Sequence, residues 1–296
     1  MQTPTTLSKE KPTLADWALR GAARSDNDAA EEFTMAEQPV LFEIRAPAAW
    51  ITLNRLTALN ALTPAVLAGI DAALNEVEQH SGVRAVVFTG SGRAFSAGAD
   101  LKFIRESSGG DPMALSHFLQ AVFTVFNRVE RFPRPVIAAV NGLALAGGLE
   151  LVLCCDLVIA AESARFGDAH ANYGLLPGGG SSVRLPRKIG PTRAKYLLYT
   201  GEFLPAREFL ATGLVNEVVP DAELTGAVER LVTKLAAKSP IGLTRMKQLI
   251  DDGLNQSEDT ALRLELLAFD LHTSSQDMQE GLAAFEEKRT PQFKGR

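Results

Sequence analysis

The chain is organised around Val140-Asn141-Gly142-Leu143-Ala144-Leu145-Ala146-Gly147-Gly148-Leu149-Glu150. The first amides of a helix have no partner within it, so a helix that starts at the glycine pair would point them at a bound group. Glu150 lies about one turn further along and can project back toward the same place. Unpaired donors beside a carboxylate suit an enzyme that forms and quenches an oxyanion. A glycine pair that packs a helix, with an exposed glutamate, would produce the same pattern.

Composition and charge indicate an ordinary globular protein. Hydrophobic residues make up 46% of the 296 positions, and the net charge of −5 argues against a nucleic-acid partner. No apolar run has the length of a membrane span, and the start lacks the pattern of a signal peptide. Adjacent Cys154 and Cys155 resemble core residues of a reducing compartment. We therefore expect a cytoplasmic protein that binds neither nucleic acid nor membrane.

From Val40 onward the chain alternates strand and helix signals, which predicts an α/β fold with mostly right-handed crossovers and one layer of helices over a stack of short strands. Residues 90–99 read as a loop. The expected strands are 40–45, 49–53, 83–89, 136–140, 157–161 and 214–219. The expected helices are 63–80, 113–131, 147–155, 192–199, 206–212, 222–237, 241–252 and 258–285.

A second unusual stretch is Arg93-Ala94-Phe95-Ser96-Ala97-Gly98-Ala99-Asp100-Leu101-Lys102. Its small residues leave the backbone bare, so that main-chain groups can touch a ligand directly. A loop amide here could aim at the point that the Gly147 amide faces, and two converging donors make an oxyanion hole. A tight loop in which Asp100 caps a following helix explains the same residues.

Together these stretches resemble the crotonase family, also called the enoyl-CoA hydratase/isomerase family, over about 35–296. The motifs that carry the resemblance are Asn54-Arg55 with Asn60-Ala61-Leu62, F-S-A-G-A-D-L-K at 95–102, N-G-x-A-x-x-G-G-x-E-L at 141–151, C-D-L-V-I-A-A-E-S-A-R-F at 155–166 and G-L-L-P-G-G-G at 174–180. The resemblance implies a crotonase-like spiral of ββα units over 38–235 and a C-terminal helical oligomerisation region over 236–296. Residues 1–37 are expected to be an extended, poorly ordered segment.

The resemblance also implies the site. Such proteins bind an acyl-CoA thioester and stabilise its enolate between two backbone amides, which match Ala99 and Gly147. The matched CoA contacts are Thr57, Ala58, Leu59, Ala97, Asp100, Leu101 and Lys102, with Phe285 and Lys288 reaching CoA on a neighbouring subunit. The helix 113–131 is expected to line or back the acyl pocket with Phe118, Phe123 and Phe126. The resemblance implies a trimer or a dimer of trimers. No spacing of His, Cys, Asp and Glu suggests a metal, and no cofactor is expected besides the CoA of the substrate.

One departure decides how the chemistry is interpreted. Hydratases of this family hold the reacting water between two glutamates; the first matches Glu150, and the second falls on His170. Glu150 could deprotonate water, and a protonated histidine could return a proton to the α-carbon, with Glu150 or Asp168 favouring its charge. A Glu/His pair could equally move a double bond or activate water to cleave a carbon–carbon bond, as histidine-bearing relatives do. His170 could also be a structural residue.

We therefore expect an enzyme of enoyl-CoA hydratase type, with Glu150 and His170 as its catalytic residues. A double-bond isomerase or a carbon–carbon bond hydrolase is the alternative among enzymes. A CoA-thioester-binding protein with little turnover is the alternative from another class; some relatives bind RNA, against which the acidic balance weighs. Retention of Glu150 and of both amide positions weighs against loss of catalysis.

Overall fold

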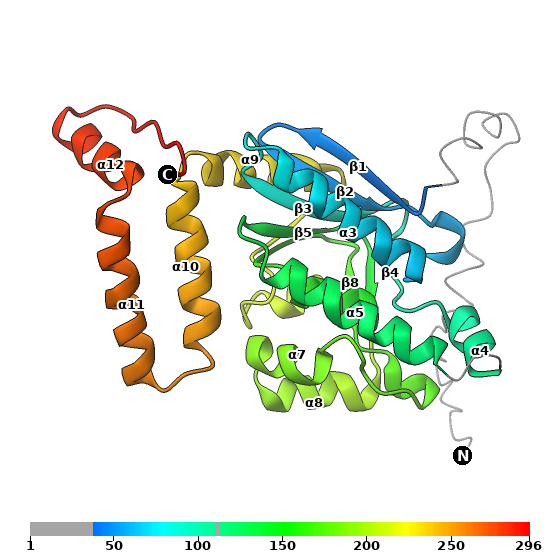
Figure 1. Ribbon diagram of the computed structural model, residues 1–296. Helices are drawn as coiled ribbons and strands as arrows, with labels where there is room; N and C mark the ends of the chain where they lie inside the picture. The colour runs from blue at the N-terminus through cyan, green and yellow to red at the C-terminus, as the bar shows by residue number, and fades with distance from the viewer. Residues whose placement is uncertain (1–37, 110–112) are drawn as a thin grey trace, which may run out of the picture. The chain divides into compact units, whose positions relative to one another are not determined.

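Short apolar runs form a six-stranded sheet in the order β1-β2-β3-β5-β7-β10 (Figure 1). The computed structural model describes residues 38–109 and 113–296. β1 and β2 are antiparallel, and the other neighbours are parallel. All of β5 is buried, as expected for a parallel strand covered on both faces. The strands are β1 Val40–Arg45, β2 Ala48–Leu53, β3 Ala85–Gly90, β5 Val136–Val140, β7 Leu157–Ala161 and β10 Glu217–Val219.

A second sheet has four short strands in the order β4-β6-β8-β9. Its strands are β4 Ala94–Ser96, β6 Leu143–Leu145, β8 Arg165–Gly167 and β9 Leu204–Pro205. This sheet corrects the prediction of a loop over 90–99 and of a single stack of strands. Two or three residues are too few to show an alternating pattern in the sequence. The second sheet matters for function because β6 leads directly into the turn at Gly147.

The helix α3 (Pro64–Gln79) shows how a local signal sets an element's start. Thr63 Oγ1 accepts a hydrogen bond from the Val66 amide at 3.4 Å, and Pro64 occupies the first helical position, as predicted. α3 packs on β1 and β2 and against α5 (Ala114–Glu130). α9 (Leu224–Ala236) contacts β3, β5 and β7.

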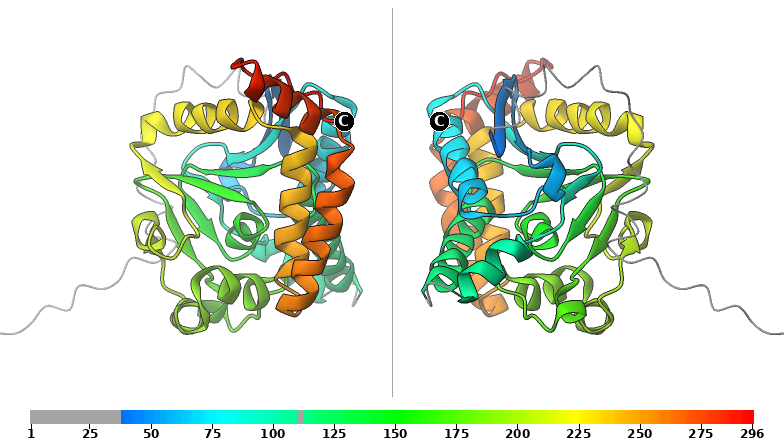
Figure 2. Two further views of the ribbon diagram at one scale, coloured as in Figure 1. Left: turned by 90° about the vertical axis from the view of Figure 1, so that its left-hand side faces the viewer. Right: turned by 90° about the vertical axis from the view of Figure 1, so that its right-hand side faces the viewer.

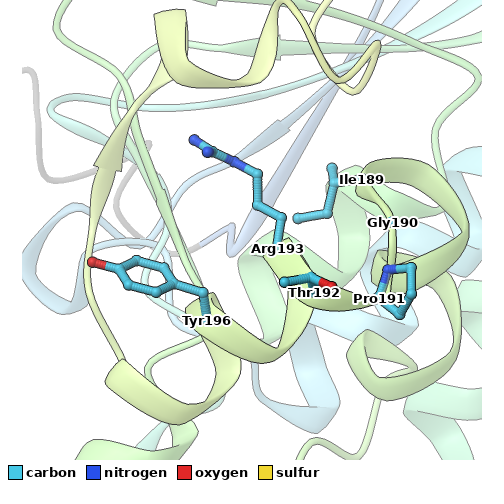
Figure 3. A pocket seen from close by; sticks show the side chains of 6 residues that line it. All are labelled: Ile189, Gly190, Pro191, Thr192, Arg193 and Tyr196. Atoms are coloured by element: carbon cyan, nitrogen blue, oxygen red, sulfur yellow. The ribbon is translucent and has the colours of Figure 1, made fainter.

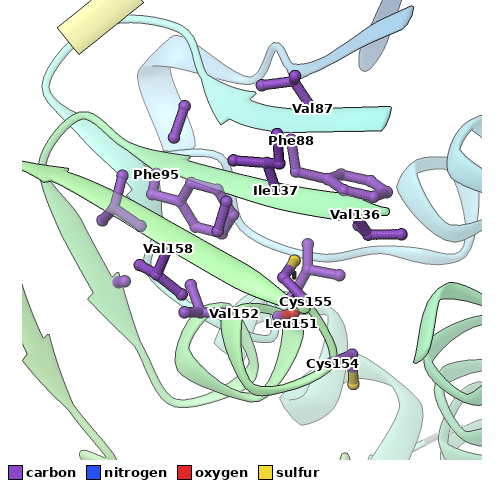
Figure 4. Close-up of a cluster of buried hydrophobic side chains, with 14 of the residues drawn as sticks. Val87, Phe88, Phe95, Val136, Ile137, Leu151, Val152, Cys154, Cys155 and Val158 are labelled. Atoms are coloured by element: carbon purple, nitrogen blue, oxygen red, sulfur yellow. Dashed lines mark hydrogen bonds between the residues drawn. The ribbon is translucent and has the colours of Figure 1, made fainter. Parts of the chain in front are cut away.

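The core lies between these helices and the first sheet, and Figure 4 shows part of it. Cys154 and Cys155 are buried here as free thiols, in agreement with the sequence analysis. Burial raises the pKa of the Cys154 thiol to about 12. Neither cysteine is a thiolate at neutral pH, so both act as small core residues.

Helices make up most of the chain from Ser181 onward. They are α7 Ser181–Ile189, α8 Pro191–Thr200, α9, α10 Pro240–Gly253, α11 Glu258–Thr273 and α12 Gln276–Glu286; a 3₁₀ turn at Ala206–Phe209 replaces the helix expected over 206–212. The helix expected over 258–285 is divided in two, because Ser275 caps α12 by accepting a hydrogen bond from the Met278 amide at 3.2 Å.

α10 and α11 pack side by side (Figure 2). α11 has no buried residue in the protomer. In the described ranges no helix is long and apolar enough to cross a membrane. Residues 38–296 cluster as one compact unit. The prediction for 1–37 lies outside the described residues.

The side chain of Asn60 links the turn that begins at Arg55 to the segment 91–94, where the second sheet begins. We expect this side chain to contribute strongly to stability. Its side-chain amide donates to the carbonyls of Ser91 and Ala94 at 2.9 and 2.7 Å, and its Oδ1 accepts from the Arg55 amide at 2.8 Å. Its φ of 57° also suits asparagine better than alanine. Asn60→Ala is expected to lower the free energy of unfolding by about 2–4 kcal/mol, measured by urea denaturation. Gln248→Ala, at an exposed position of α10, is the control and should change it little; equal effects would contradict the role of Asn60.

Candidate active site

The turn at Ala146 presents the first amide of α6 (Gly147–Leu153). Ala146 has φ 46° and ψ −118°, an uncommon conformation for a residue with a side chain. Its own amide donates to the Gly167 carbonyl at 2.9 Å, which joins the turn to the end of β8. The tertiary structure therefore holds a strained backbone where the helix begins, and such strain is concentrated at functional sites.

The loop after β4 brings a second amide to the same point. The Leu62 amide donates to Gly98 O at 2.7 Å, and the Asp100 amide donates to Leu62 O at 3.0 Å. This parallel bridge turns the amide of the intervening Ala99 away from Leu62. A Cβ placed on Gly147 would lie 3.4 Å from the Ala99 nitrogen, and one on Gly98 would lie 2.9 Å from the Gly147 nitrogen. Over 38–109 and 113–296, neither the Ala99 nor the Gly147 amide donates to a protein acceptor.

Glu150 is almost fully buried, with 2% of its surface exposed. Its Oε1 accepts hydrogen bonds from the amides of Gly179 and Ser181 at 2.8 and 3.0 Å. Burial raises the pKa of its carboxyl, and the two amides and the charge of His170 oppose that rise. The alternative of an exposed glutamate on a packing helix is therefore wrong.

Glycine at 179 is required by the close approach to Glu150. A Cβ there would lie 2.6 Å from Glu150 Oε2 and 3.0 Å from the ring of Phe126. Arg184 holds this segment by donating from Nη1 to the Gly179 carbonyl at 2.8 Å. These donors were missed in the sequence, although a glycine run followed by serine and a helical pattern is itself a sign of free amides at a helix start.

His170 faces Asp168. The imidazole Nδ1 lies 2.9 Å from Asp168 Oδ1, and Asp168 is 1% exposed. Both ring nitrogens of a protonated imidazole are donors, so in that form Nδ1 donates to the Asp168 carboxyl. Burial lowers the pKa of His170, but its hydrogen bond to Asp168 and the charges of Asp168 and Glu150 outweigh this, and the net pKa is raised. The structure thus brings Glu150, Asp168 and His170 into one electrostatic group.

The candidate CoA contacts fall into two places. Thr57 and Ala58 lie on the turn Leu56–Ala58, and the Leu59 carbonyl accepts from the Ala97 amide at 2.9 Å, which places the early loop against 97–100. Asp100 Oδ1 accepts from the amides of Lys102 and Phe103 at 3.0 and 3.3 Å, so it does cap α4 (Leu101–Gly109). Its other oxygen pairs with Arg55 at 2.9 Å.

Phe285 and Lys288 lie elsewhere. Phe285 is on α12 and is 84% exposed, and Lys288 follows that helix. Figure 1 places α12 and α4 at opposite sides of the described unit. Within one protomer the structure does not bring these two residues to the loop 97–102, so the predicted contact needs a neighbouring subunit.

The expected aromatic lining is only partly correct. Phe118 and Phe126 are buried, and Phe126 lies beside Gly179 next to the carboxylate of Glu150. Phe123, on the same helix, is 61% exposed and points away from this core. Positions 123 and 126 are one turn apart, but Phe123 falls outside the stripe of buried residues on this helix, which are Phe118, Val122, Val125, Phe126 and Val129. Phe126 therefore backs the site, and Phe123 does not.

A surface hollow between α7 and α8 is distinct from this group (Figure 3). It is lined by Ile189, Gly190, Pro191, Thr192, Arg193 and Tyr196. None of the predicted site residues lines it, and we assign it no ligand. Across the described residues no cluster of three or more His, Cys, Asp or Glu side chains is placed to hold a metal ion.

Comparison with known proteins identifies the family. The model of the enoyl-CoA hydratase/isomerase family matches residues 43–296. The chain belongs to the enoyl-CoA hydratase/isomerase family. A crotonyl-CoA hydratase of Syntrophomonas wolfei is 38% identical over 260 residues, which cover 88% of this chain and 99% of that protein. A short-chain-enoyl-CoA hydratase of Clostridium acetobutylicum is 39% identical over 84% of this chain and 95% of its own length.

A solved structure shares the fold. The enoyl-CoA hydratase of Bacillus anthracis superimposes with a TM-score of 0.83 at 39% identity, covering 88% of this chain and all of that one. The predicted family and the crotonase-like fold are thus confirmed. The roles of individual residues in this member of the enoyl-CoA hydratase/isomerase family stay predictions that the geometry supports.

Gly147→Ala tests the pair of amides. The added methyl would lie 2.9 Å from Leu62 Cδ1 and 3.4 Å from the Ala99 nitrogen, between the two donors. We expect kcat for an acyl-CoA substrate to fall by about 100-fold or more, the loss typical of one oxyanion donor, measured in a steady-state assay. Gly82→Ala is the control, because a Cβ at Gly82 has no neighbour within 4 Å. Unchanged kcat in Gly147→Ala would contradict the assignment of an oxyanion hole.

Proposed function

We propose that this enzyme adds water across the double bond of a 2-enoyl-CoA thioester and catalyses the reverse elimination. The observation that carries the proposal is the group formed by buried Glu150 and the Asp168–His170 pair, together with the Ala99 and Gly147 amides, which have no protein acceptor in the described residues. The relatives named as crotonyl-CoA and short-chain-enoyl-CoA hydratases support the same reaction class. No cofactor is required besides the CoA that the substrate carries.

The thioester oxygen would accept hydrogen bonds from the amides of Ala99 and Gly147. Ionised Glu150 would take a proton from water as the oxygen attacks the β-carbon, and the electron pair of the double bond would pass to the thioester oxygen as an enolate. Protonated His170 would then deliver a proton to the α-carbon and restore the thioester carbonyl. The proton from water stays on Glu150 until His170 is reprotonated, so atoms and charge balance.

The charge states fit these roles. Above the raised pKa of Glu150 the carboxylate is available as the base, and below the raised pKa of His170 the imidazolium is available as the acid. The two groups stabilise each other's charged forms. A pair with opposite charges at the same pH is what concerted addition of a hydroxyl and a proton needs.

The direct test is the loss of enoyl-thioester absorbance when crotonyl-CoA is mixed with the purified protein. Product analysis by mass then distinguishes the reactions: hydration adds one water, isomerisation leaves the mass unchanged, and carbon–carbon cleavage splits the acyl group. Loss of absorbance with gain of water supports the proposal. An unchanged absorbance with every member of a panel of 2-enoyl-CoAs would contradict the proposal and favour a CoA-thioester-binding protein with little turnover.

We further propose a trimer or dimer of trimers in which α11 is covered by another subunit. The exposed fractions of Leu262, Leu266 and Phe269 on this helix are 54, 66 and 56%. Such an apolar surface on one helix is typical of a subunit interface. Light scattering during size-exclusion chromatography tests it. We also propose that, in this assembly, Phe285 and Lys288 contact the CoA bound by a neighbouring subunit.

We propose a cytoplasmic location for the protein. Its free cysteines, Cys154 and Cys155, fit a reducing compartment.

A further inference from the structure

A second hollow lies where β3 and β5 begin, beside the end of α9 and the start of α10. Its volume is about 210 Å³. Apolar side chains such as Val83 and Leu243 form part of the wall. The cationic residues that line it are Arg84, Arg134, Lys238 and Lys294. Arg84 and Pro135 immediately precede β3 and β5, whereas the candidate catalytic residues follow the other ends of β6 and β8.

These cations have few partners of their own. Among the residues that the structure describes, Arg84, Lys238 and Lys294 make no side-chain ion pair or hydrogen bond. Arg134 donates to the neutral Val77 carbonyl at 2.6 Å. Burial lowers the pKa of Arg134, and the charge of Arg84 lowers it further. Like charges are therefore held close together in a partly enclosed space.

The nearest carboxylates offset only part of the positive charge of the hollow, and the charge of Asp277 reaches Arg84. Asp277 is buried and accepts from Ser239 Oγ at 2.6 Å and from the amides of Lys294 and Gly295 at 2.7 and 3.0 Å. Glu78, whose charge also reaches Arg134, is paired with Arg128 at 2.9 Å. Glu280, whose charge reaches Lys294, is paired with Arg289 at 2.6 Å. Because Glu78 and Glu280 are paired with other arginines, Asp277 alone of these three carboxylates is left to offset four cations, and an excess of positive charge remains.

We propose that this hollow is a binding site for a phosphate or diphosphate group. Arginine guanidinium groups match phosphate oxygens with paired N–H donors, and lysine ammonium groups add charge. A partly enclosed site strengthens these interactions over those at an open surface. A bound phosphate group also relieves the repulsion between Arg84 and Arg134. The group can belong to a free anion or to a nucleotide such as CoA, since the recognising chemistry is the same.

The test is calorimetric titration of the full chain with inorganic phosphate, pyrophosphate and CoA at fixed ionic strength. The variant Lys238→Gln/Lys294→Gln removes two cations whose side chains have no partner in the described residues. The control variant Lys195→Gln/Lys234→Gln makes the same change of charge at exposed positions outside the hollow. We expect saturable one-site binding of pyrophosphate by the wild type and the control, and at least about tenfold weaker binding by the hollow variant.

Two results would overturn the proposal: no saturable binding of phosphate or pyrophosphate, or equal weakening in the hollow and control variants. Unfolding midpoints without ligand check that the variants fold. Because the hollow variant loses repulsion, its midpoint should equal or exceed that of the wild type. If the hollow variant binds both CoA and pyrophosphate more weakly than the wild type, the hollow binds the phosphate groups of a nucleotide. If the variant binds only the inorganic anions more weakly, the hollow binds free anions. Neither result depends on hydratase activity.

Discussion

Glu150→Gln is expected to lower kcat for hydration of crotonyl-CoA by about 100-fold or more, the contribution of a general base. The glutamine oxygen can still accept the hydrogen bonds from Gly179 and Ser181, so the segment stays in place. The amide cannot take a proton from water, however. The loss should appear in kcat with little change in KM, because the thioester is held by other groups. The measurement is the initial rate of enoyl-thioester absorbance loss.

The same variant should not be less stable than the wild type. The pKa of Glu150 is raised by burial, so the folded protein disfavours its carboxylate. That penalty is present above the raised pKa and is relieved as pH falls through it; a neutral amide removes it at every pH. We expect an unchanged or higher unfolding midpoint at pH 7. Glu229→Gln, at an exposed position of α9, is the control and should keep wild-type kcat. Equal kcat in both variants would remove Glu150 from the mechanism.

His170→Gln is expected to reduce kcat by about 100-fold, the typical contribution of a general acid. The wild-type rate should rise with pH as Glu150 ionises and fall as His170 loses its proton, because the reaction needs the carboxylate and the imidazolium together.

The pKa of His170 is raised chiefly by Asp168, against the effect of burial. Asp168→Asn should therefore move the falling limb of the pH profile to lower pH. The measurement is kcat across the pH range.

Asp168 is tested as a positioning residue by the direction of that shift. A merely structural role of Asp168 would lower the rate at every pH without moving the falling limb of the pH profile.

His170→Glu restores the second glutamate of the family's hydratases. A gain in hydration rate in that variant would show that the native histidine directs the site toward another reaction, whereas a loss would show that it takes part in this one.

The central strands of the first sheet, β3, β5 and β7, could be predicted from the sequence because they are largely apolar runs. Val136–Val140 is buried throughout, and its composition alone predicts a strand. The second sheet could not be predicted, since Ala94–Ser96 and Leu143–Leu145 have only three residues each. Their pairing depends on contacts between residues about fifty positions apart, which no local pattern encodes.

The candidate site was predicted more from sequence motifs shared with the family than from physical reasoning about single residues. Spacing placed Glu150 one turn after Gly147, but the amides that hold its carboxylate come from residues 179 and 181. The partner of His170 could be proposed from its position two residues after Asp168, and the structure adds the burial that makes this interaction strong. The cationic hollow had no signal in the sequence, because its members come from four separated segments.

The buried thiols have a practical consequence for experiments on this enzyme. The chain has two cysteines, and both are buried, with the pKa of Cys154 raised to about 12. Alkylating reagents attack thiolates, so the native protein offers them almost no target. A single cysteine introduced at the exposed position of Lys234 on α9 would then carry a fluorophore without background labelling. The assembly of subunits could be followed by energy transfer, and the native thiols would report only on unfolding.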